Sequence, residues 1–271
     1  MNKIYIIPTP IGNLEDITFR AITTLKNVDC ILAEDTRKSK KLLNHYNIST
    51  KIISYHQHNE HQKLMKIIEN IKSGINYAII SDAGTPSISD PGFLLVRECV
   101  KNDILVETLP GPTALIPALV NSGLASDRFV FEGFLPKKKI DRERILLEIS
   151  KNEKTTILYE SPKRLIKLLK ELLEFCGGDR EIMVARELTK KFEEHVGNNI
   201  NNVIEFFKDK EIIGEITIVI KGIKKRDFNP NKSIIKKDLN YLIDAGLSLS
   251  AASKYLAKKN GLKKSEVYNL I

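Results

Sequence analysis

The residues with the clearest chemical potential lie in a twelve-residue segment, Ser81 to Gly92. It holds two Gly, two Pro, two Asp and three Ser, a composition that excludes regular secondary structure. The apolar run 77–80 before it is typical of a buried strand, and 93–100 after it has helical spacing. Ligands of open α/β sheets bind at such strand ends, and a plain connection needs only about 2–6 residues. We therefore interpret the segment as a ligand-binding loop, not as a turn whose Ser and Asp only satisfy backbone donors.

Similar polar loops rich in Gly and Pro follow the other predicted strands of the first half of the chain. They are Thr9 to Asp16, Glu34 to Arg37, His56 to Glu60 and Pro110 to Ala114. The second half has comparable segments at 160–164, at 186–194 and at Gly214. Two sheets that face each other through these loops would form an interdomain cleft large enough for a small ligand.

The elements that must position these loops alternate regularly at first. Predicted strands at 4–7, 30–33, 52–55, 77–80 and 104–108, each followed by a helical pattern, favour a doubly wound, mostly parallel sheet. Strands predicted near 155–159, 181–185 and 216–220 alternate less regularly and favour a mixed sheet. We expect an α/β fold of two lobes with a cofactor cleft between them and a small helical tail. The expected domains are 1–114, 115–222 and 232–271, the last with a helix-turn-helix-like turn at 260–262.

The net charge of +9 is concentrated at one end of the 271-residue chain. Residues 221–271 contain twelve Lys and Arg against four Asp and Glu, a net charge of +8. A basic tail on a nearly neutral body indicates a polyanionic partner, most simply a nucleic acid. The alternative is a lysine-rich proteome in which Lys is the default surface residue.

Cysteine usage and hydropathy bear on the compartment. The three cysteines, Cys30, Cys99 and Cys176, are far apart and lie in apolar or helical surroundings, so we expect buried thiols in a reducing compartment. We find no run of 18 apolar residues and no signal peptide at the N-terminus. The expected location is the cytoplasm.

Common motifs for other chemistries are missing from the sequence. There is no GxGxxG, GxxxxGK[ST], HExxH, CxxC or GxSxG pattern, which weighs against the usual NAD, NTP, zinc and hydrolase sites. His56, His58 and His61 have irregular spacing and no accompanying cysteine, so we predict no metal site. They are interpreted as polar residues near a substrate, with plain solvated side chains as the alternative.

Six motifs, in order along the first 220 residues, resemble those of the ribosomal RNA small subunit methyltransferase I family, a branch of the tetrapyrrole-methylase-like, class III methyltransferases. They are TPIGNLED (9–16), AEDTR (33–37), SDAGTP with SDPG (81–92), PGPTA (110–114), ESPKR (160–164) and ARELTK (185–190). Thr113 stands where the family usually has Ser and keeps the hydroxyl. Lys163 replaces a common His, which puts any role of that His in doubt here.

The resemblance implies methyl transfer from S-adenosyl-L-methionine to the ribose 2′-hydroxyl of a cytidine in the decoding region of 16S rRNA. It also implies a homodimer. This hydroxyl is a poor nucleophile whose proton a carboxylate or a Lys could take, and the candidate catalytic residues, which the sequence does not rank, are Glu34, Asp35 and Glu187. The residues expected to bind the cofactor are Asp82, Ala83, Gly84, Thr85, Pro86, Thr113, Ala114, Tyr159, Ala185 and Gly214. Those expected to face RNA are Asn13, Arg37, Arg164, Arg186 and Lys190.

Two other functions stay open at this point. One is methylation of a tetrapyrrole or another small anionic substrate, which would not need the basic tail. The other is a non-catalytic RNA-binding protein of ribosome assembly, which would not bind S-adenosylmethionine. For each charged residue of the predicted site, an ordinary surface salt bridge is the competing interpretation.

Overall fold

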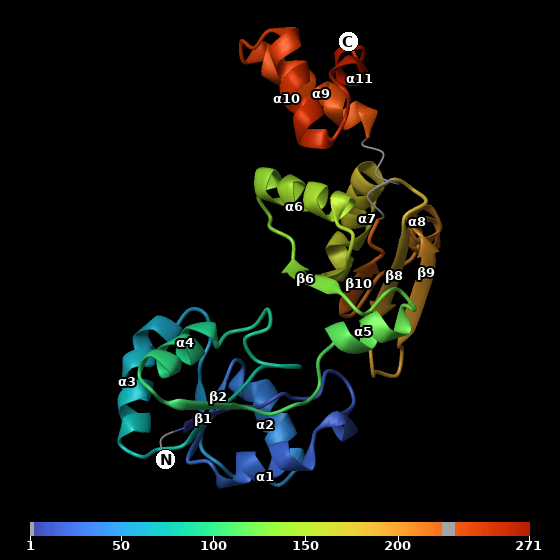
Figure 1. Cartoon of the computed structure of the whole chain (residues 1–271). Helices are drawn as coiled ribbons and strands as arrows, with labels where there is room; N and C mark the ends of the chain where they lie inside the picture. The colour runs from blue at the N-terminus through green and yellow to red at the C-terminus, as the bar shows by residue number, and fades with distance from the viewer. Residues whose placement is uncertain (1–2, 224–230) are drawn as a thin grey trace. The chain divides into compact units, whose positions relative to one another are not determined.

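The computed structural model describes residues 3–223 and 231–271 (Figure 1). The chain divides into two compact units. The first comprises Met1–Asn121 with Ala185–Glu194, and the second comprises Ser122–Val184 with His195–Ile271. The predicted domain boundaries at 114 and 222 stay a prediction.

The first unit is built on a five-stranded sheet with the strand order β3-β2-β4-β1-β5. Its strands are β1 (Lys3–Ile6), β2 (Cys30–Ala33), β3 (Ile52–Ser54), β4 (Tyr77–Ile80) and β5 (Leu105–Thr108). All of its strand pairs are parallel. Their carboxyl ends therefore meet at one edge, where the polar loops emerge, as the regular alternation of the sequence predicts.

Helices cover both faces of this sheet. They are α1 (Phe19–Asn27), α2 (Thr36–His45), α3 (Glu60–Lys72) and α4 (Phe93–Lys101). Apolar residues of α1 and α2 share one core with Ile31 and Ile80 of the sheet. Residues of α3 and α4 share another core with Leu32 and Ile79. Neighbouring residues of one strand thus face opposite cores, because successive side chains point to opposite faces.

A mixed sheet with the order β6-β7-β10-β8-β9 belongs almost entirely to the second unit. Its strands are β6 (Phe129–Phe134), β7 (Thr155–Glu160), β8 (Glu181–Arg186), β9 (Glu194–Asn199) and β10 (Ile216–Ile220). β6 and β7 are parallel, whereas β10 and β7 are antiparallel. The remaining helices of the α/β part are α5 (Leu115–Asn121), α6 (Lys139–Lys151), α7 (Pro162–Cys176) and α8 (Ile200–Phe207). The expected α/β class with a mixed second sheet is confirmed.

Three helices form the tail: α9 (Lys232–Asp244), α10 (Leu249–Asn260) and α11 (Lys264–Tyr268). They enclose a small core that includes Leu239, Leu256 and Val267. Gly261 ends α10 in the left-handed conformation, with φ +67°, as glycine commonly does after a helix.

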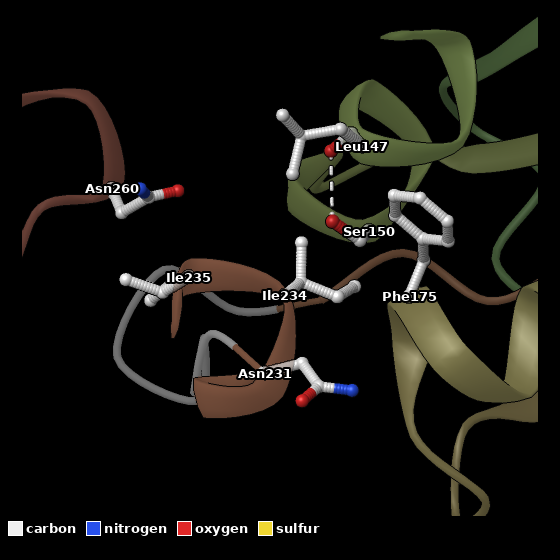
Figure 2. Close-up of a pocket in the computed structure, with 7 residues that line it drawn as sticks. All are labelled: Leu147, Ser150, Phe175, Asn231, Ile234, Ile235 and Asn260. Carbon is white, nitrogen blue, oxygen red and sulfur yellow. Dashed lines mark hydrogen bonds between the residues drawn. The ribbon is translucent and has the colours of Figure 1, made fainter. Parts of the chain in front are cut away.

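A small pocket lies where the tail meets α6 and α7, and Figure 2 shows the residues that line it. Hydrogen bonds near this pocket join the tail to the two helices. The Lys151 ammonium donates to the carbonyl of Lys259 (3.3 Å) and to the side-chain oxygen of Asn260 (3.2 Å) at the end of α10. Asn231 donates to the carbonyl of Glu174. The residues lining the pocket are Leu147, Ser150, Phe175, Asn231, Ile234, Ile235 and Asn260. None of them belongs to the predicted site, so we interpret this pocket as a packing feature.

Cysteine burial and helix length complete the description. Cys30 and Cys99 are buried and Cys176 is half-buried. Burial raises the pKa of the Cys99 and Cys176 thiols to about 11, which makes them poor nucleophiles near neutral pH. Within the described ranges, no helix is both long enough and apolar enough to cross a membrane.

Candidate active site at the carboxyl edge of the first sheet

Three loops at this edge are joined to one another by hydrogen bonds. The amide of Thr9 donates to the carbonyl of Gly84, and the amide of Gly84 donates to the carbonyl of Thr9, each at 2.9 Å. The hydroxyl of Thr85 donates to the carbonyl of Pro112 at 2.9 Å. The loops after β1, β4 and β5 are therefore fixed as one piece.

The loop after β4 has an unusual backbone. Gly84 has φ +77°, and a Cβ there would lie 3.4 Å from Cγ2 of Ile11. Ser87 and Ser89 also have positive φ, at +71° and +62°. Non-glycine residues rarely adopt this conformation unless the surroundings impose it, and such positions gather at ligand sites.

The predicted cofactor residues of the first unit lie on these joined loops. Asp82, Ala83 and Thr85 are half-buried, and so are Thr113 and Ala114, while Gly84 and Pro86 are buried. The Cα of Thr113 lies 4.0 Å from the point where Gly84 would carry a Cβ. The structure thus brings the SDAGTP and PGPTA motifs together.

The two aspartates of the site are both occupied by partners. Asp82 accepts from the amide of Asp35 (3.1 Å) and pairs with the ammonium of Lys38 (2.7 Å). Asp35 accepts from the amide of Arg37 at the start of α2 and forms two further bonds with its guanidinium (3.2 and 3.0 Å). These bonds to Arg37 lower the pKa of Asp35 to about 2. Both carboxylates therefore position the loops, and the lowered pKa makes Asp35 a weak base.

Glu34 has the opposite character. It follows β2 directly, and among the described residues it has no ion-pair partner within 4 Å. Burial raises the pKa of Glu34 above its ordinary 4.5, and the carboxylate of Asp82 adds to the rise, while the amide of Asp82 and the charges of Lys38 and His56 oppose it. A carboxylate whose pKa is raised in this way is better matched to taking a proton than its neighbours are.

His56 lies close to Glu34 because β2 and β3 are paired. Ala33 is opposite Ser54 in the sheet, and Glu34 and His56 come shortly after these two residues. The Nε2 atom of His56 lies 3.1 Å from the side-chain nitrogen of Asn59. Its Nδ1 atom is buried and has no hydrogen-bond partner among the described residues. No group of three or more His, Cys, Asp or Glu side chains in residues 3–223 and 231–271 is arranged to hold a metal ion.

The ARELTK motif, which comes late in the chain, is part of the first unit. The hydroxyl of Thr189 accepts from the amide of Asn13 at 3.1 Å. A Cβ on Gly12 would lie 2.4 Å from Cγ of Lys190, so only glycine permits this approach. Glu187 has φ +55° and pairs with Lys190 at 2.8 Å. The candidate base Glu187 is thus held in an ion pair.

Other predicted residues have structural partners as well. Arg186 pairs with Glu194 at 3.0 Å, Asn13 caps the short helix Leu14–Asp16, and Ala185 is buried in β8. The side chain of Arg37 is 89% exposed. It is therefore far more accessible than the side chains of Arg164, Arg186 and Lys190, which are 32%, 22% and 28% exposed.

Three predicted residues lie in the second unit. Tyr159 packs edge-to-face against Phe131 and Phe134, with ring centroids 4.9 and 5.7 Å away. Gly214 has φ +100° before β10. Arg164 is held by Glu160 at 2.7 Å.

An ion cluster around Glu160 escaped prediction. Glu160 is 2% exposed and also lies 3.6 Å from Arg142, which pairs with Glu171 at 2.7 Å. Lys38, the partner of Asp82, was missed too. The placement of Lys38 three residues after the cap Asp35 is the signal that could have revealed it, because residues on the first turn of a helix face its preceding loop. Arg142 has no such signal, since it lies in an ordinary charged helix.

Comparison with known proteins places this geometry in a family. The sequence profile of the tetrapyrrole (corrin/porphyrin) methylases matches residues 3–203. The ribosomal RNA small subunit methyltransferase I of Synechocystis sp. is 45% identical over 272 residues, which cover 100% of this chain and 97% of that protein. The protein of the same name from Thermotoga maritima is 46% identical over 222 residues, 82% of this chain and 99% of that protein.

Solved structures share the fold. Cobalt precorrin-4 methyltransferase superposes with a TM-score of 0.61 at 17% identity and covers 81% of this chain and 94% of its own. Uroporphyrin-III C-methyltransferase of Thermus thermophilus, in complex with S-adenosylhomocysteine, gives 0.55 at 18% identity, with 80% and 96% covered. The chain therefore belongs to the tetrapyrrole methylase family, and within it to the ribosomal RNA small subunit methyltransferase I group, which uses S-adenosylmethionine as its methyl donor.

Proposed function

We propose that the protein methylates the ribose 2′-hydroxyl of a cytidine in the decoding region of 16S rRNA, with Glu34 as the general base. The observation that carries the proposal is the difference among the three candidate carboxylates. Asp35 and Glu187 are neutralised by Arg37 and Lys190. Glu34 lacks such a partner among the described residues, and its pKa is raised. It is the carboxylate best suited to accept the hydroxyl proton.

The joined loops fit the methyl donor. Asp82, Ala83, Gly84, Thr85 and Pro86 would hold its methionine part and Thr113 and Ala114 its adenosine, because these loops combine a fixed backbone with mostly half-buried residues. Tyr159, Ala185 and Gly214 would complete the adenosine site, as the resemblance implies. When bound, S-adenosylmethionine supplies a methyl group whose bond to sulfur breaks as the new O–CH₃ bond forms, with loss of the sulfonium charge.

The chain's own residues then have three tasks. Glu34 removes the proton of the 2′-hydroxyl as the oxygen attacks, which contributes typically 10²–10⁴ in rate. The fixed loops hold the donor in line with that oxygen, and such positioning supplies much of the barrier reduction. Asn13, Arg37, Arg164, Arg186 and Lys190 would hold the RNA.

An RNA substrate is favoured over a tetrapyrrole by two observations. The tail is strongly basic, and full-length relatives at 45% identity carry the name ribosomal RNA small subunit methyltransferase I. A small anionic substrate gives no reason for a basic tail. From the resemblance we also propose a homodimer in the cytoplasm, and sedimentation velocity of the purified protein tests the dimer.

The deciding experiment incubates the purified protein and S-adenosylmethionine, labelled in its methyl group, with small ribosomal subunits that lack the modification. We expect label in an alkali-resistant dinucleotide, because a 2′-O-methyl group blocks cleavage of the next phosphodiester. Donor binding is measured in parallel by calorimetry, with Asp82→Ala as a variant of the donor site.

Each other outcome contradicts the proposal in its own way. Donor binding that is sensitive to Asp82→Ala but gives no label in RNA would overturn the RNA substrate and leave a small acceptor. Absence of donor binding would indicate a non-catalytic RNA-binding protein. Label in a base instead of the ribose would overturn the assigned acceptor atom.

A further inference from the structure

The tyrosines of the tail are exposed, whereas those of the two α/β lobes are not. The chain has eight tyrosines, and those that are exposed are Tyr241, Tyr255 and Tyr268, at 62%, 57% and 44%. All three lie in the tail, one on each helix. The five tyrosines of the two α/β lobes are buried or half-buried. The core of the tail therefore uses none of its three tyrosines, and a role for them has to be sought at the surface.

Each exposed tyrosine has a lysine on the same face of its helix. Residues three or four apart are neighbours on a helix surface. The pairs at this spacing are Lys237 with Tyr241 on α9, Tyr255 with Lys258 on α10, and Lys264 with Tyr268 on α11. Lys254 lies beside Tyr255. We call these seven residues the tyrosine–lysine surface.

The lysines of this surface are available for an external anion. All four are exposed, and Lys237, Lys254 and Lys258 have no acidic partner within 4 Å among the described residues. The ammonium of Lys264 donates to the hydroxyl of Ser250, a neutral group, at 2.7 Å. Other positions of the same helices are buried, because Leu239, Leu256 and Val267 form the tail core.

The combination of groups selects one class of partner. Lysine neutralises phosphates but has no flat face, and residues 231–271 contain no arginine or tryptophan that could stack on a base. The tyrosine rings therefore provide the only large aromatic faces on the described tail. Proteins that bind single strands combine cationic side chains along the backbone with aromatic rings on which bases stack. In a duplex the base faces are covered by their neighbours, and such rings would gain little.

The shape of the tail also argues against reading of a duplex groove. The second helix of the predicted helix-turn-helix, α11, has five residues, which is only about 7–8 Å of helix at 1.5 Å per residue. Recognition helices lie along the groove and contact several successive bases, and α11 is too short for that.

We propose that the tyrosine–lysine surface binds unpaired RNA, with bases stacked on Tyr241, Tyr255 and Tyr268 and phosphates held by the lysines. The proposal rests on the proposed function only for the source of the RNA, which would be an unpaired segment of the ribosomal RNA near the modified nucleotide. Binding at this surface needs neither the methyl donor nor Glu34.

The test measures fluorescence anisotropy of the full-length protein with a labelled single-stranded RNA of twelve nucleotides and with a duplex of the same sequence. In the key variant Tyr241, Tyr255 and Tyr268 are all changed to Ala. We expect tighter binding of the single strand by the unaltered protein, and a loss on the order of tenfold for each tyrosine removed. The triple change to Phe should retain binding, because stacking uses the ring and not the hydroxyl.

Salt dependence separates the two kinds of interaction. The change of Lys237, Lys254 and Lys258 to Gln should flatten the plot of log K against log salt by about 0.7 for each phosphate that is no longer neutralised. The alanine variant should weaken binding with little change in slope. Phe93→Ala is the matched control, since Phe93 is an aromatic residue of the first unit, 61% exposed and beside Arg97. It should leave binding unchanged.

Three results would overturn the proposal: full single-strand affinity in the alanine variant, equal affinity for the duplex, or an equal loss in Phe93→Ala. Circular dichroism with the phenylalanine variant as reference shows whether the tail stays folded. Methyl transfer to small subunits is scored separately. Stacking without methyl transfer would refute the proposed function alone, and methyl transfer without stacking would refute this inference alone.

Discussion

The joined loops of the first unit and the tyrosine–lysine surface of the tail treat polar side chains in opposite ways. In the first unit, Asp82 of the joined loops, and Asp35 and Glu187 outside them, are each paired with a cation at 3.0 Å or less. On the tail, Lys237, Lys254 and Lys258 stand exposed with no acidic partner among the described residues.

The difference reflects what each region has to do. The proposed methyl transfer needs its atoms held within a fraction of an ångström, and the ion pairs of Asp35, Asp82 and Glu187 fit that need, whereas Glu34 is left for the proposed proton transfer. Binding of a long polyanion needs many weak contacts that tolerate movement, and paired lysines would lose that attraction. A single unpaired carboxylate among paired ones thus indicates a catalytic group, whereas several unpaired lysines on one surface indicate a binding site for RNA.

The largest expected effect tests Glu34, the unpaired carboxylate, as the general base. Glu34→Gln should lower the rate of methyl transfer by 10²–10⁴ while donor affinity stays near that of the unaltered protein, because an amide cannot take the proton. Single-turnover kinetics with saturating donor measures it. Asp35→Asn is the matched control and should cost less, since it loses the cap of α2. A larger effect of Asp35→Asn would reverse the roles.

A change in the tail core tests whether the tail is energetically separate. Leu239 is fully buried there, and Leu239→Ala should cost about 2–5 kcal/mol of local stability. Such a loss should weaken RNA binding and leave donor binding unchanged. Leu168→Ala, at an equally buried position of α7, should instead lower the melting temperature of the second lobe. Calorimetric scans of both variants show whether the tail unfolds separately from the lobes. Loss of donor binding in Leu239→Ala would contradict the energetic separation of the tail.

Two glycines with positive φ allow a matched comparison of the regions. Gly84 in the joined loops has φ +77°, and Gly246 between α9 and α10 has φ +94°. Alanine at either position should cost ~1–2 kcal/mol, because the left-handed region strains a Cβ. Only Gly84→Ala should also weaken donor binding, as measured by calorimetry. Equal donor affinities in the two variants would remove Gly84 from the cofactor site.

The smallest expected effect concerns stability and pH. The pKa of Glu34 is raised in the folded state, so the folded state holds that proton more tightly than the unfolded one. Its contribution to stability is therefore full below the unfolded pKa of about 4.5 and is lost as pH rises through the folded pKa. Compared with Glu34→Gln, the unaltered protein should lose melting temperature across that window and be the less stable of the two at pH 7. The opposite sign would show that Glu34 has an unrecognised cationic partner.

Much of the first unit could be predicted because its signals are local. Short apolar runs that end in Gly and Pro loops mark parallel strands, and the fixed direction of those strands puts the loops at one edge. The SDAGTP and PGPTA motifs were expected to cooperate, and Thr85 does contact Pro112. Which carboxylate keeps a raised pKa could not be predicted, because it depends on how near Arg37 and Lys38 come to their neighbours.

The second unit shows where local signals fail. β9 (Glu194–Asn199) was missed, because EHVGNN lacks the apolar alternation of a strand and mostly faces water at the edge of its sheet. The ion cluster of Arg142, Glu160 and Glu171 joins a strand to two helices, a long-range contact that no spacing reveals. The membership of residues 185–194 in the first unit was not foreseen for the same reason.

That membership has a consequence for synthesis of the chain. The strands of the first sheet are all made by Thr108, yet the segment that packs on Gly12 and Asn13 ends only at Glu194. At elongation rates of about 5–20 residues per second, the first unit must wait several seconds for its last piece. During that interval the nascent loop around Gly12 is uncovered, so a truncated chain that ends before residue 185 should be a poor donor-binding protein even though it contains the whole first sheet.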